Sequence, residues 1–226
     1  MRRHLIRTLL VCGATTAAVV LGSSQVFAAN TVTITFGGTF MGTRASNYTL
    51  TDNNSGVRVT CTSGNLTADF GAVASAALPY NIAKTGGGTG ALMAFGVGAC
   101  TSSLGTATVT TSIPDDVVIN AVPGTFGFNA DGYIQNHAGA NAAIVTVSVL
   151  TCTFQVSGQA PFAYTSPAMP NGNGQLQVNP GVMDSGGTGL TINNVSAGCF
   201  GMVSNGDSLN FAGAWAVNPA PTITTP

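Results

Sequence analysis

Few residues beyond position 28 could carry acid–base or nucleophilic chemistry. His137 is the one histidine there, and it lies in the polar, glycine-flanked segment 136–139, which predicts a loop. A Ser–His–Asp triad requires only that its partners meet in space, so a secreted hydrolase using His137 remains an alternative. The sequence has no G-x-S-x-G elbow, so we favour a solvated loop histidine.

Carboxylates for glycosidic cleavage would have to be aspartates, because the sequence contains no glutamate. Asp115 and Asp116 would point to opposite faces of a strand, and their position after Pro114 favours an aspartate-rich turn. The segments 52–54 and 129–132 are rich in oxygen ligands, but Asx turns produce the same strings without calcium. We therefore predict no catalytic residue, no metal site and no cofactor.

The cysteines beyond position 28 could hold a metal or form disulfides. They include no C-x2-C pair, which argues against a zinc site. An even number of cysteines in an exported chain predicts two disulfides, for which three connectivities exist. The four residues are Cys61, Cys100, Cys152 and Cys199.

A repeated string selects one of these connectivities. Gly-Gly-Thr-Gly occurs at 87–90 and again at 186–189, and each copy is followed after nine residues by a cysteine. The duplication predicts one disulfide in each copy, Cys61–Cys100 and Cys152–Cys199. Neither string is expected to bind phosphate, because each leads into a predicted strand and not into a helix N-terminus.

The first 28 residues predict a signal peptide. Three arginines precede the apolar run 8–21, and the small residues at 26 and 28 suit cleavage after Ala28 or, one residue later, after Ala29. The paired arginines leave twin-arginine export open beside the general route. We expect a secreted protein, extracellular or associated with the cell envelope, without a transmembrane segment once the signal is removed.

The charge of the mature chain limits its partners, which are otherwise unknown. Residues 29–226 carry Arg44, Arg58 and Lys84 against seven aspartates, so their formal net charge is −4. Nucleic acid and anionic lipid surfaces require a basic patch. Three dispersed cations do not form one, so we expect no nucleic-acid partner.

The elements that must position these residues are predicted to be strands. Apolar residues alternate with Thr, Ser and Asn, as in 31–36, where Val32, Ile34 and Phe36 would face inward. The segment 161–174, with its prolines and Asn-Gly pairs, predicts a long loop. Trp215, the sole tryptophan, is expected in the core and not as a sugar platform. It shares one face of the last strand with Leu209, Phe211, Gly213 and Val217.

Short strands at this spacing predict an all-β, antiparallel protein. We expect two tandem sandwich-like or barrel-like repeats, residues 29–123 and 124–217, each with one disulfide. Pro123-Gly124 marks the boundary, and residues 218–226 form a Pro/Thr-rich tail. One larger β-sandwich formed jointly by the two halves is the alternative.

Several strings of the chain resemble a family of uncharacterised secreted actinobacterial proteins. They are Ser-Ala-Gly-Cys-Phe-Gly-Met-Val-Ser-Asn-Gly-Asp at 196–207, Ala-Trp-Ala-Val at 214–217, Gly-Ala-Cys-Thr at 98–101 and Val-Thr-Cys-Thr at 59–62. The resemblance implies export and a disulfide-bonded β fold. It implies no activity.

We therefore expect an exported, non-enzymatic structural or binding protein of the cell envelope or the extracellular medium. The hydrolase using His137 is one alternative. A small-ligand carrier is the other, and it would need an apolar cavity between the halves or inside a barrel.

Overall fold

The computed structural model describes residues 31–35, 37–83, 85, 90–122, 128–166, 173–178 and 188–225. Apart from one short 3-10 helix, the regular elements of this part are β-strands, and their pairings are antiparallel. The predicted all-β class is confirmed. The alternation of β-branched and polar residues explains it, because such side chains pack well on a pleated, half-buried surface.

The elements in chain order are β1 (Thr31–Ile34), β2 (Gly38–Arg44), β3 (Tyr48–Asp52), β4 (Arg58–Phe70), β5 (Val73–Ala77), β6 (Tyr80–Asn81), β7 (Leu92–Ser102), β8 (Gly105–Thr111), β9 (Asp115–Ala121), β10 (Ala130–Asn136), β11 (Ala143–Val149), β12 (Cys152–Thr165), β13 (Gly174–Val178), β14 (Gly189–Asn193), η2 (Ala197–Cys199), β15 (Ser208–Asn218) and β16 (Ile223–Thr224).

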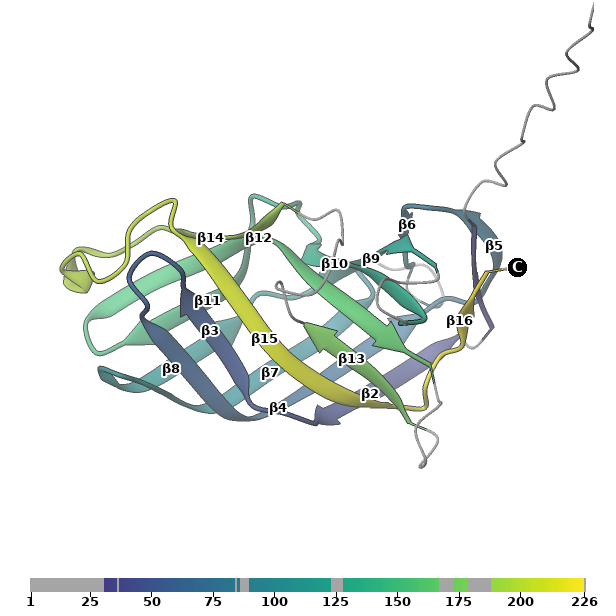
Figure 1. Ribbon diagram of the computed structural model, residues 1–226, viewed down its shortest axis with the longest axis horizontal. Helices are drawn as coiled ribbons and strands as arrows, with labels where there is room; N and C mark the ends of the chain where they lie inside the picture. Colours follow the sequence, from purple (N-terminus) through teal and green to yellow (C-terminus); the bar gives the residue numbers. More distant parts are fainter. Residues whose placement is uncertain are drawn as a thin grey trace, which may run out of the picture.

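The large sheet closes on itself (Figure 1). Four positions of the ring are the long strands β4, β7, β12 and β15. The other four are each shared by two shorter strands, namely β2 with β3, β8 with β9, β10 with β11 and β13 with β14. Each position pairs with the next along the chain, and β15 returns to pair with β2 and β3. Among the described strands this makes a ring of eight positions.

Both predicted halves contribute to this ring. Strands of the first half meet the second where β8 pairs with β11 and β9 with β10, and again where β15 pairs with β2 and β3. The buried apolar residues form one continuous core. The halves therefore do not form the two separate tandem repeats that we expected. They form one sheet jointly, as in the alternative, and this sheet is closed. Residues 123–127, around the predicted boundary, lie outside the described residues.

A second, three-stranded sheet of β16, β1 and β5 lies beside one end of the ring (Figure 1). Val32 and Ile34 of β1 and Ile223 of β16 are buried and belong to the common core. The inward direction predicted for Val32 and Ile34 is confirmed, and Phe36 lies outside the described residues.

Both disulfides form as predicted. Cys61 of β4 is bonded to Cys100 of β7, its register partner, and Cys152 at the start of β12 is bonded to Cys199 in η2. They close loops with sequence separations of 39 and 47 residues. On the chain-entropy model, loops of this length contribute about 4 kcal/mol each to the free energy of unfolding.

Two local predictions are wrong. Residues 161–165 continue β12, which ends at Thr165, because Phe162 and Tyr164 alternate into the core as strand residues do. Asp115 and Asp116 begin strand β9 and do not form a turn. The prolines at 167 and 170 lie outside the described residues. So do residues 86–89 and 179–187, which include three residues of the first Gly-Gly-Thr-Gly string and two of the second.

Candidate functional site

A cavity lies inside the closed sheet. Its wall takes side chains from β3, β4, β7, β8, β9, β10, β11, β12, β14 and β15, so nearly the whole ring contributes. Its volume is about 30 Å³, which is room for about two water molecules, since one water needs about 10–15 Å³ on this scale. The side chains around it are apolar or aromatic except at a few positions, which define the candidate site.

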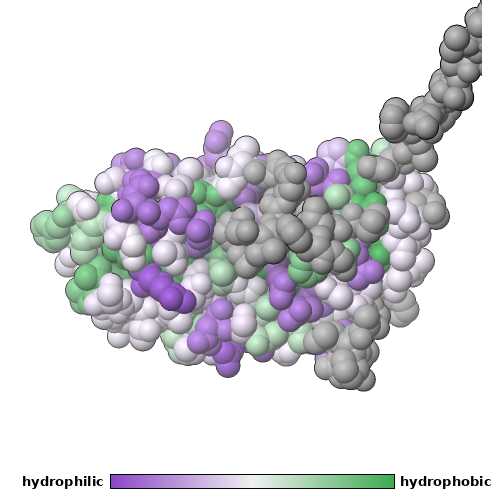
Figure 2. Space-filling view, in the orientation of Figure 1, coloured by the Kyte–Doolittle hydropathy of each residue, from purple (hydrophilic) through white to green (hydrophobic). Residues whose placement is uncertain are grey.

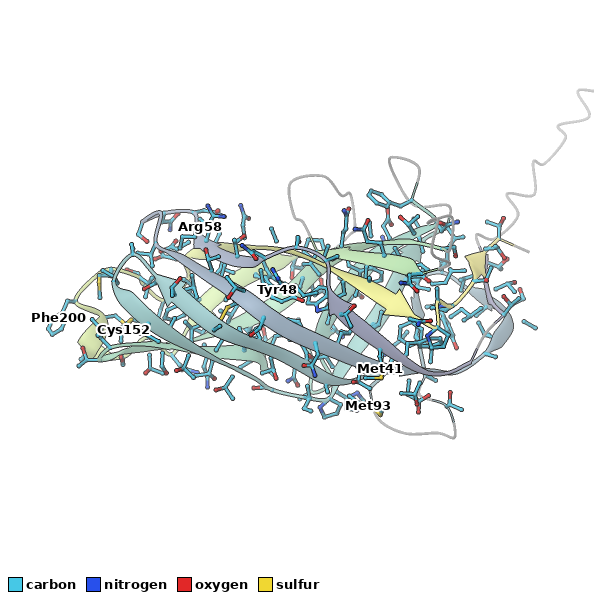
Figure 3. All side chains as sticks on the ribbon, turned by 90° about the horizontal axis from the view of Figure 1, so that it is seen from below. Met41, Tyr48, Arg58, Met93, Cys152 and Phe200 are labelled. Carbon is cyan, nitrogen blue, oxygen red and sulfur yellow. A yellow bond between two sulfur atoms is a disulfide. The ribbon has the colours of Figure 1, made fainter. Side chains whose placement is uncertain are left out.

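Four aromatic side chains form one part of the wall. The ring of Tyr48 stacks on Trp215 with 4.8 Å between centroids, and Phe95 meets Trp215 edge-on at 5.4 Å. Phe211 contacts both Phe95 and Trp215 edge-on. Tyr48 and Trp215 are each 1% exposed, and Tyr48 lies in the middle of the closed sheet in Figure 3. The prediction that Trp215 belongs to the core is confirmed.

Two glycines make room for the Tyr48 ring. A Cβ atom at Gly64 would lie 2.5 Å from Cε2 of Tyr48, and one at Gly213 would overlap Cδ1. Gly64 is on β4 and Gly213 on β15, the two strands that flank β3 in the ring. Any larger residue at either position would therefore displace the tyrosine from the wall.

Among the described residues, Asp115 supplies the one carboxyl group of the cavity wall. It is 0% exposed, and its two carboxyl oxygens have no hydrogen-bond partner among the described residues. It begins β9 and faces Leu92 of β7, its register partner, which also lines the cavity. Burial, and to a smaller extent the neighbouring charge of Asp116, raise the pKa of Asp115 to about 8. The carboxyl group is therefore mostly protonated at neutral pH in the empty cavity.

The hydroxyl oxygen of Tyr48 and the indole nitrogen of Trp215 are also buried, and neither has a hydrogen-bond partner within the described part of the chain. Burial raises the pKa of Tyr48 to about 12, although the positive charge of Arg44 acts in the opposite direction. A buried polar group without a partner costs about 1–3 kcal/mol, and most such groups in proteins have one. All three residues line the cavity, but its accessible surface is apolar, so these polar atoms lie behind the surface that a ligand would meet.

His137 and Asp116 meet on the outer side of the ring. Nδ1 of His137 lies 2.8 Å from Oδ1 of Asp116, whose Oδ2 accepts a hydrogen bond from Nδ2 of Asn81 at 3.1 Å. The histidine side chain is 42% exposed and follows β10 in a turn, as predicted. The structure thus brings His137 to an aspartate, as the hydrolase alternative requires. None of the hydrogen bonds described for His137 involves a serine.

The two oxygen-rich segments differ in structure. Asp52 forms an Asx turn, because its carboxylate accepts hydrogen bonds from the backbone N–H of Asn54 and the hydroxyl of Ser55. Residues 130–132 lie in β10, and Asp131 is fully buried there. Among the described residues no three His, Cys, Asp or Glu side chains are placed to hold a metal ion.

The face shown in Figure 2 is largely of intermediate hydropathy with hydrophilic patches, and apolar residues include a group at its left end. Leu150, after β11, is 79% exposed, and Phe200, after η2, is 84% exposed and projects from this end in Figure 3. Both residues have positive φ angles, 54° and 49°. Among the described residues, no helix is long and apolar enough to cross a membrane.

Asp115 was not expected as a site residue, and no sequence pattern connected it with Tyr48. The alternation of Tyr48 with Leu50 was a usable signal for an inward tyrosine, and both residues line the cavity. Asp115 carried no such signal, because an aspartate after a proline is typical of turns.

Comparisons of this chain with protein-family models, with curated proteins and with solved structures returned no match.

Proposed function

We propose that this chain is an exported, non-enzymatic binding protein that holds a small ligand inside its closed sheet. The observation that supports this is the apolar cavity inside the closed sheet, whose wall includes Asp115, Tyr48 and Trp215. Binding sites for small molecules are typically apolar cavities with a few placed polar groups. Closed sheets of about eight strands are wide enough for side chains or one small ligand.

Several features support the remaining parts of this proposal. The signal sequence, the two disulfides and the resemblance to secreted actinobacterial proteins support export to the envelope or the medium. The duplicated Gly-Gly-Thr-Gly strings support an origin of the ring from two copies of one unit, each with its own disulfide. A binding role rather than catalysis is supported by the cavity wall, which, within the part of the chain that the structure describes, includes one aspartate and no histidine.

The sole tryptophan provides a direct test, because Trp215 lines the cavity. The mature, disulfide-bonded protein is titrated with methanol, formate and methylammonium, which are neutral, anionic and cationic probes of two or three heavy atoms. Ligands this small bind weakly, so the titration extends to about 100 mM at constant ionic strength. We expect at least one probe to change Trp215 emission saturably and to raise the temperature of unfolding.

A filled cavity is the matched comparison. Ala160→Val adds two methyl groups to the wall of the cavity and is expected to abolish the response. Ala74→Val, at an exposed position of β5 that does not line the cavity, adds the same two methyl groups and is expected to leave the response intact. If no probe alters Trp215 emission in a saturable way, or if Ala160→Val responds like the wild type, the proposal is wrong.

The contact between His137 and Asp116 favours a second candidate, a secreted hydrolase. A serine activated by this pair would react with a fluorophosphonate probe, and His137→Gln would remove the reaction. Labelling that is absent from the wild-type protein, or unchanged by His137→Gln, would dismiss this candidate.

A further inference from the structure

We propose that a groove on the outer face of the closed sheet binds a neutral saccharide through the hydroxyl and amide groups of Asn141, Ser157, Thr191 and Asn193. This inference goes beyond the proposed function, because among the described residues the groove and the cavity have no lining residue in common. The position of the groove, its unused polar groups, its lack of charge and its size support it.

The groove lies over strands β12 and β14, which run side by side (Figure 1). Val156 of β12 and Leu190 of β14 line the cavity, whereas the residues that follow them, Ser157 and Thr191, line the groove. Successive residues of a strand point to opposite faces of a sheet, so the groove opens outward. The turn between β10 and β11 forms its other wall and contributes Asn141.

Two glycines shape one end of the groove. A Cβ atom at Gly158 of β12 would lie 2.1 Å from the carbonyl oxygen of Gly189, the last residue of the second Gly-Gly-Thr-Gly string. Gly189 has a φ of 81°, which glycine adopts without strain. The backbone N–H of Thr188 donates a hydrogen bond to Oε1 of Gln159 at 2.9 Å. The end of the repeated string is thereby fixed against β12, where Thr188 and Gly189 line the groove.

The side chain of Asn193 is held so that its oxygen remains available. Its Nδ2 donates to Oγ of Ser157 at 2.6 Å and to Oγ1 of Thr191 at 3.3 Å. An amide nitrogen has two hydrogens, and these two contacts use both. The structure describes no partner for Oδ1 of Asn193 or for the exposed amide of Asn141, and Ser157 keeps its own O–H to donate. The residues of the groove thus offer a fixed acceptor, a free amide and hydroxyl groups.

The composition of the groove favours a neutral, hydroxylated ligand. Its described lining residues are alanine, asparagine, serine, glycine and threonine, so an ion would lose its hydration there without meeting a counter-charge. Polar and apolar atoms contribute about equally to the accessible surface of the groove. A saccharide matches both properties, because its hydroxyl groups donate and accept hydrogen bonds and its C–H groups are apolar.

A peptide suits this groove less well, because the strand beneath it has no free edge. Ser157 pairs with Ala143 of β11 on one side and with Thr191 of β14 on the other. Extended peptides commonly bind by adding a strand to an exposed sheet edge. Recognition in the groove must therefore use side chains, and these are the short hydroxyl and amide groups described above.

The size of the groove allows one sugar ring. Its volume is about 330 Å³, at the lower end of the range of about 300–1,000 Å³ that small-molecule sites occupy. No aromatic side chain lines it within the described part of the chain, so hydrogen bonds must provide most of the affinity. Because each such bond replaces one to water, we expect a Kd in the millimolar range.

The experiment is an amide NMR titration of the ¹⁵N-labelled mature, disulfide-bonded protein with glucose, galactose, mannose and N-acetylglucosamine. Each sugar is added to about 100 mM, since binding is weak. We expect at least one of them to shift the amide signals of Gly158, Gly189 and Thr191 saturably, with a Kd that does not change with ionic strength. Formate and methylammonium, tested alike as charged comparisons, should not shift these signals saturably.

Matched variants test the side chains. Thr191→Val removes a hydroxyl group from an exposed strand position of the groove and should weaken binding about three- to tenfold. Thr110→Val makes the same change at an exposed position of β8 that does not line the groove, and it should retain the wild-type Kd. Asn141→Ala, on the opposite wall, should also weaken binding. The NMR spectrum of each variant reports whether its fold is kept.

Three results would overturn the saccharide inference. One is the absence of saturable shifts at Gly158, Gly189 and Thr191 with all four sugars. Another is a Kd that neither Thr191→Val nor Asn141→Ala changes. The third is a stronger response of these amides to formate or methylammonium than to any sugar. All three leave the cavity proposal standing, because Trp215 emission tests it at separate residues.

Discussion

Asp115→Asn is expected to make the protein more stable at neutral pH, by an amount that depends on pH. Below pH 4 the carboxyl group of Asp115 is protonated in the folded and the unfolded chain, so it imposes no penalty. Between pH 4 and 8 the unfolded chain releases the proton while the folded chain retains it, because burial raises the pKa of Asp115 from 3.8 to about 8. Above pH 8 both states are ionised and the penalty stays constant.

The size of the effect follows from this window. Each pH unit between the two pKa values lowers the free energy of unfolding by about 1.4 kcal/mol. At pH 7 the penalty amounts to about 4 kcal/mol, a large part of the 5–15 kcal/mol that stabilises a typical domain. The asparagine is neutral at every pH and nearly isosteric, so the variant should match the wild type near pH 4 and exceed its stability by about 4 kcal/mol at pH 7.

The assay is urea unfolding of both proteins from pH 4 to 9, followed by Trp215 emission with the disulfides intact. Asp116→Asn is the control, because the Asp116 carboxylate already has Asn81 and His137 as partners. It should keep most of the fall in stability between pH 4 and 8, because burial is the larger cause of the raised pKa of Asp115 and the charge of Asp116 is the smaller one. Parallel curves for wild type and Asp115→Asn would refute the assignment of Asp115 as a buried, protonated acid.

Three further outcomes follow from the packing and the backbone. Gly213→Ala should lower the free energy of unfolding by about 1–3 kcal/mol and change the near-ultraviolet circular dichroism of the aromatic cluster, since its Cβ would overlap Tyr48; an unchanged spectrum would contradict the described cluster. Replacing both Cys152 and Cys199 by alanine should lower the free energy of unfolding by up to about 4 kcal/mol in urea, and an unchanged midpoint would show that this bond is not formed. Leu150→Gly should raise stability by about 1 kcal/mol, because Leu150 is exposed with a φ of 54°, and a loss of stability in the same assay would disprove that backbone conformation.

Part of the candidate site could be predicted from the sequence. The alternation along the last strand placed Leu209, Phe211, Trp215 and Val217 on one buried face, and the structure confirms it. Asp115 does not follow the rule that the buried face of a strand carries apolar residues, because it is an aspartate in the wall of an apolar cavity. Local patterns read such a residue as a turn or an outward position, so Asp115 could not be recognised.

The continuation of β12 through Pro161 shows a similar limit. Proline lacks the N–H that strand pairing uses, so the sequence predicted a loop from residue 161. In the structure Pro161 faces Tyr133 of β10 in register, while Phe162 and Tyr164 are buried on the inner side. The burial of two aromatic side chains outweighs one missing donor, and single-residue rules do not contain that comparison.

The sequence by itself determined the class of this protein and its covalent framework. Period-two alternation, turn residues and the spacing of a duplicated string were sufficient for an all-β chain with the bonds Cys61–Cys100 and Cys152–Cys199. Only the tertiary structure decided that β15 pairs with β2 and β3, which closes the sheet and places Asp115, Tyr48 and Trp215 around one cavity. The reason is physical, because alternation specifies which face of a strand is buried, whereas ring closure depends on hydrogen bonds between strands far apart in the chain.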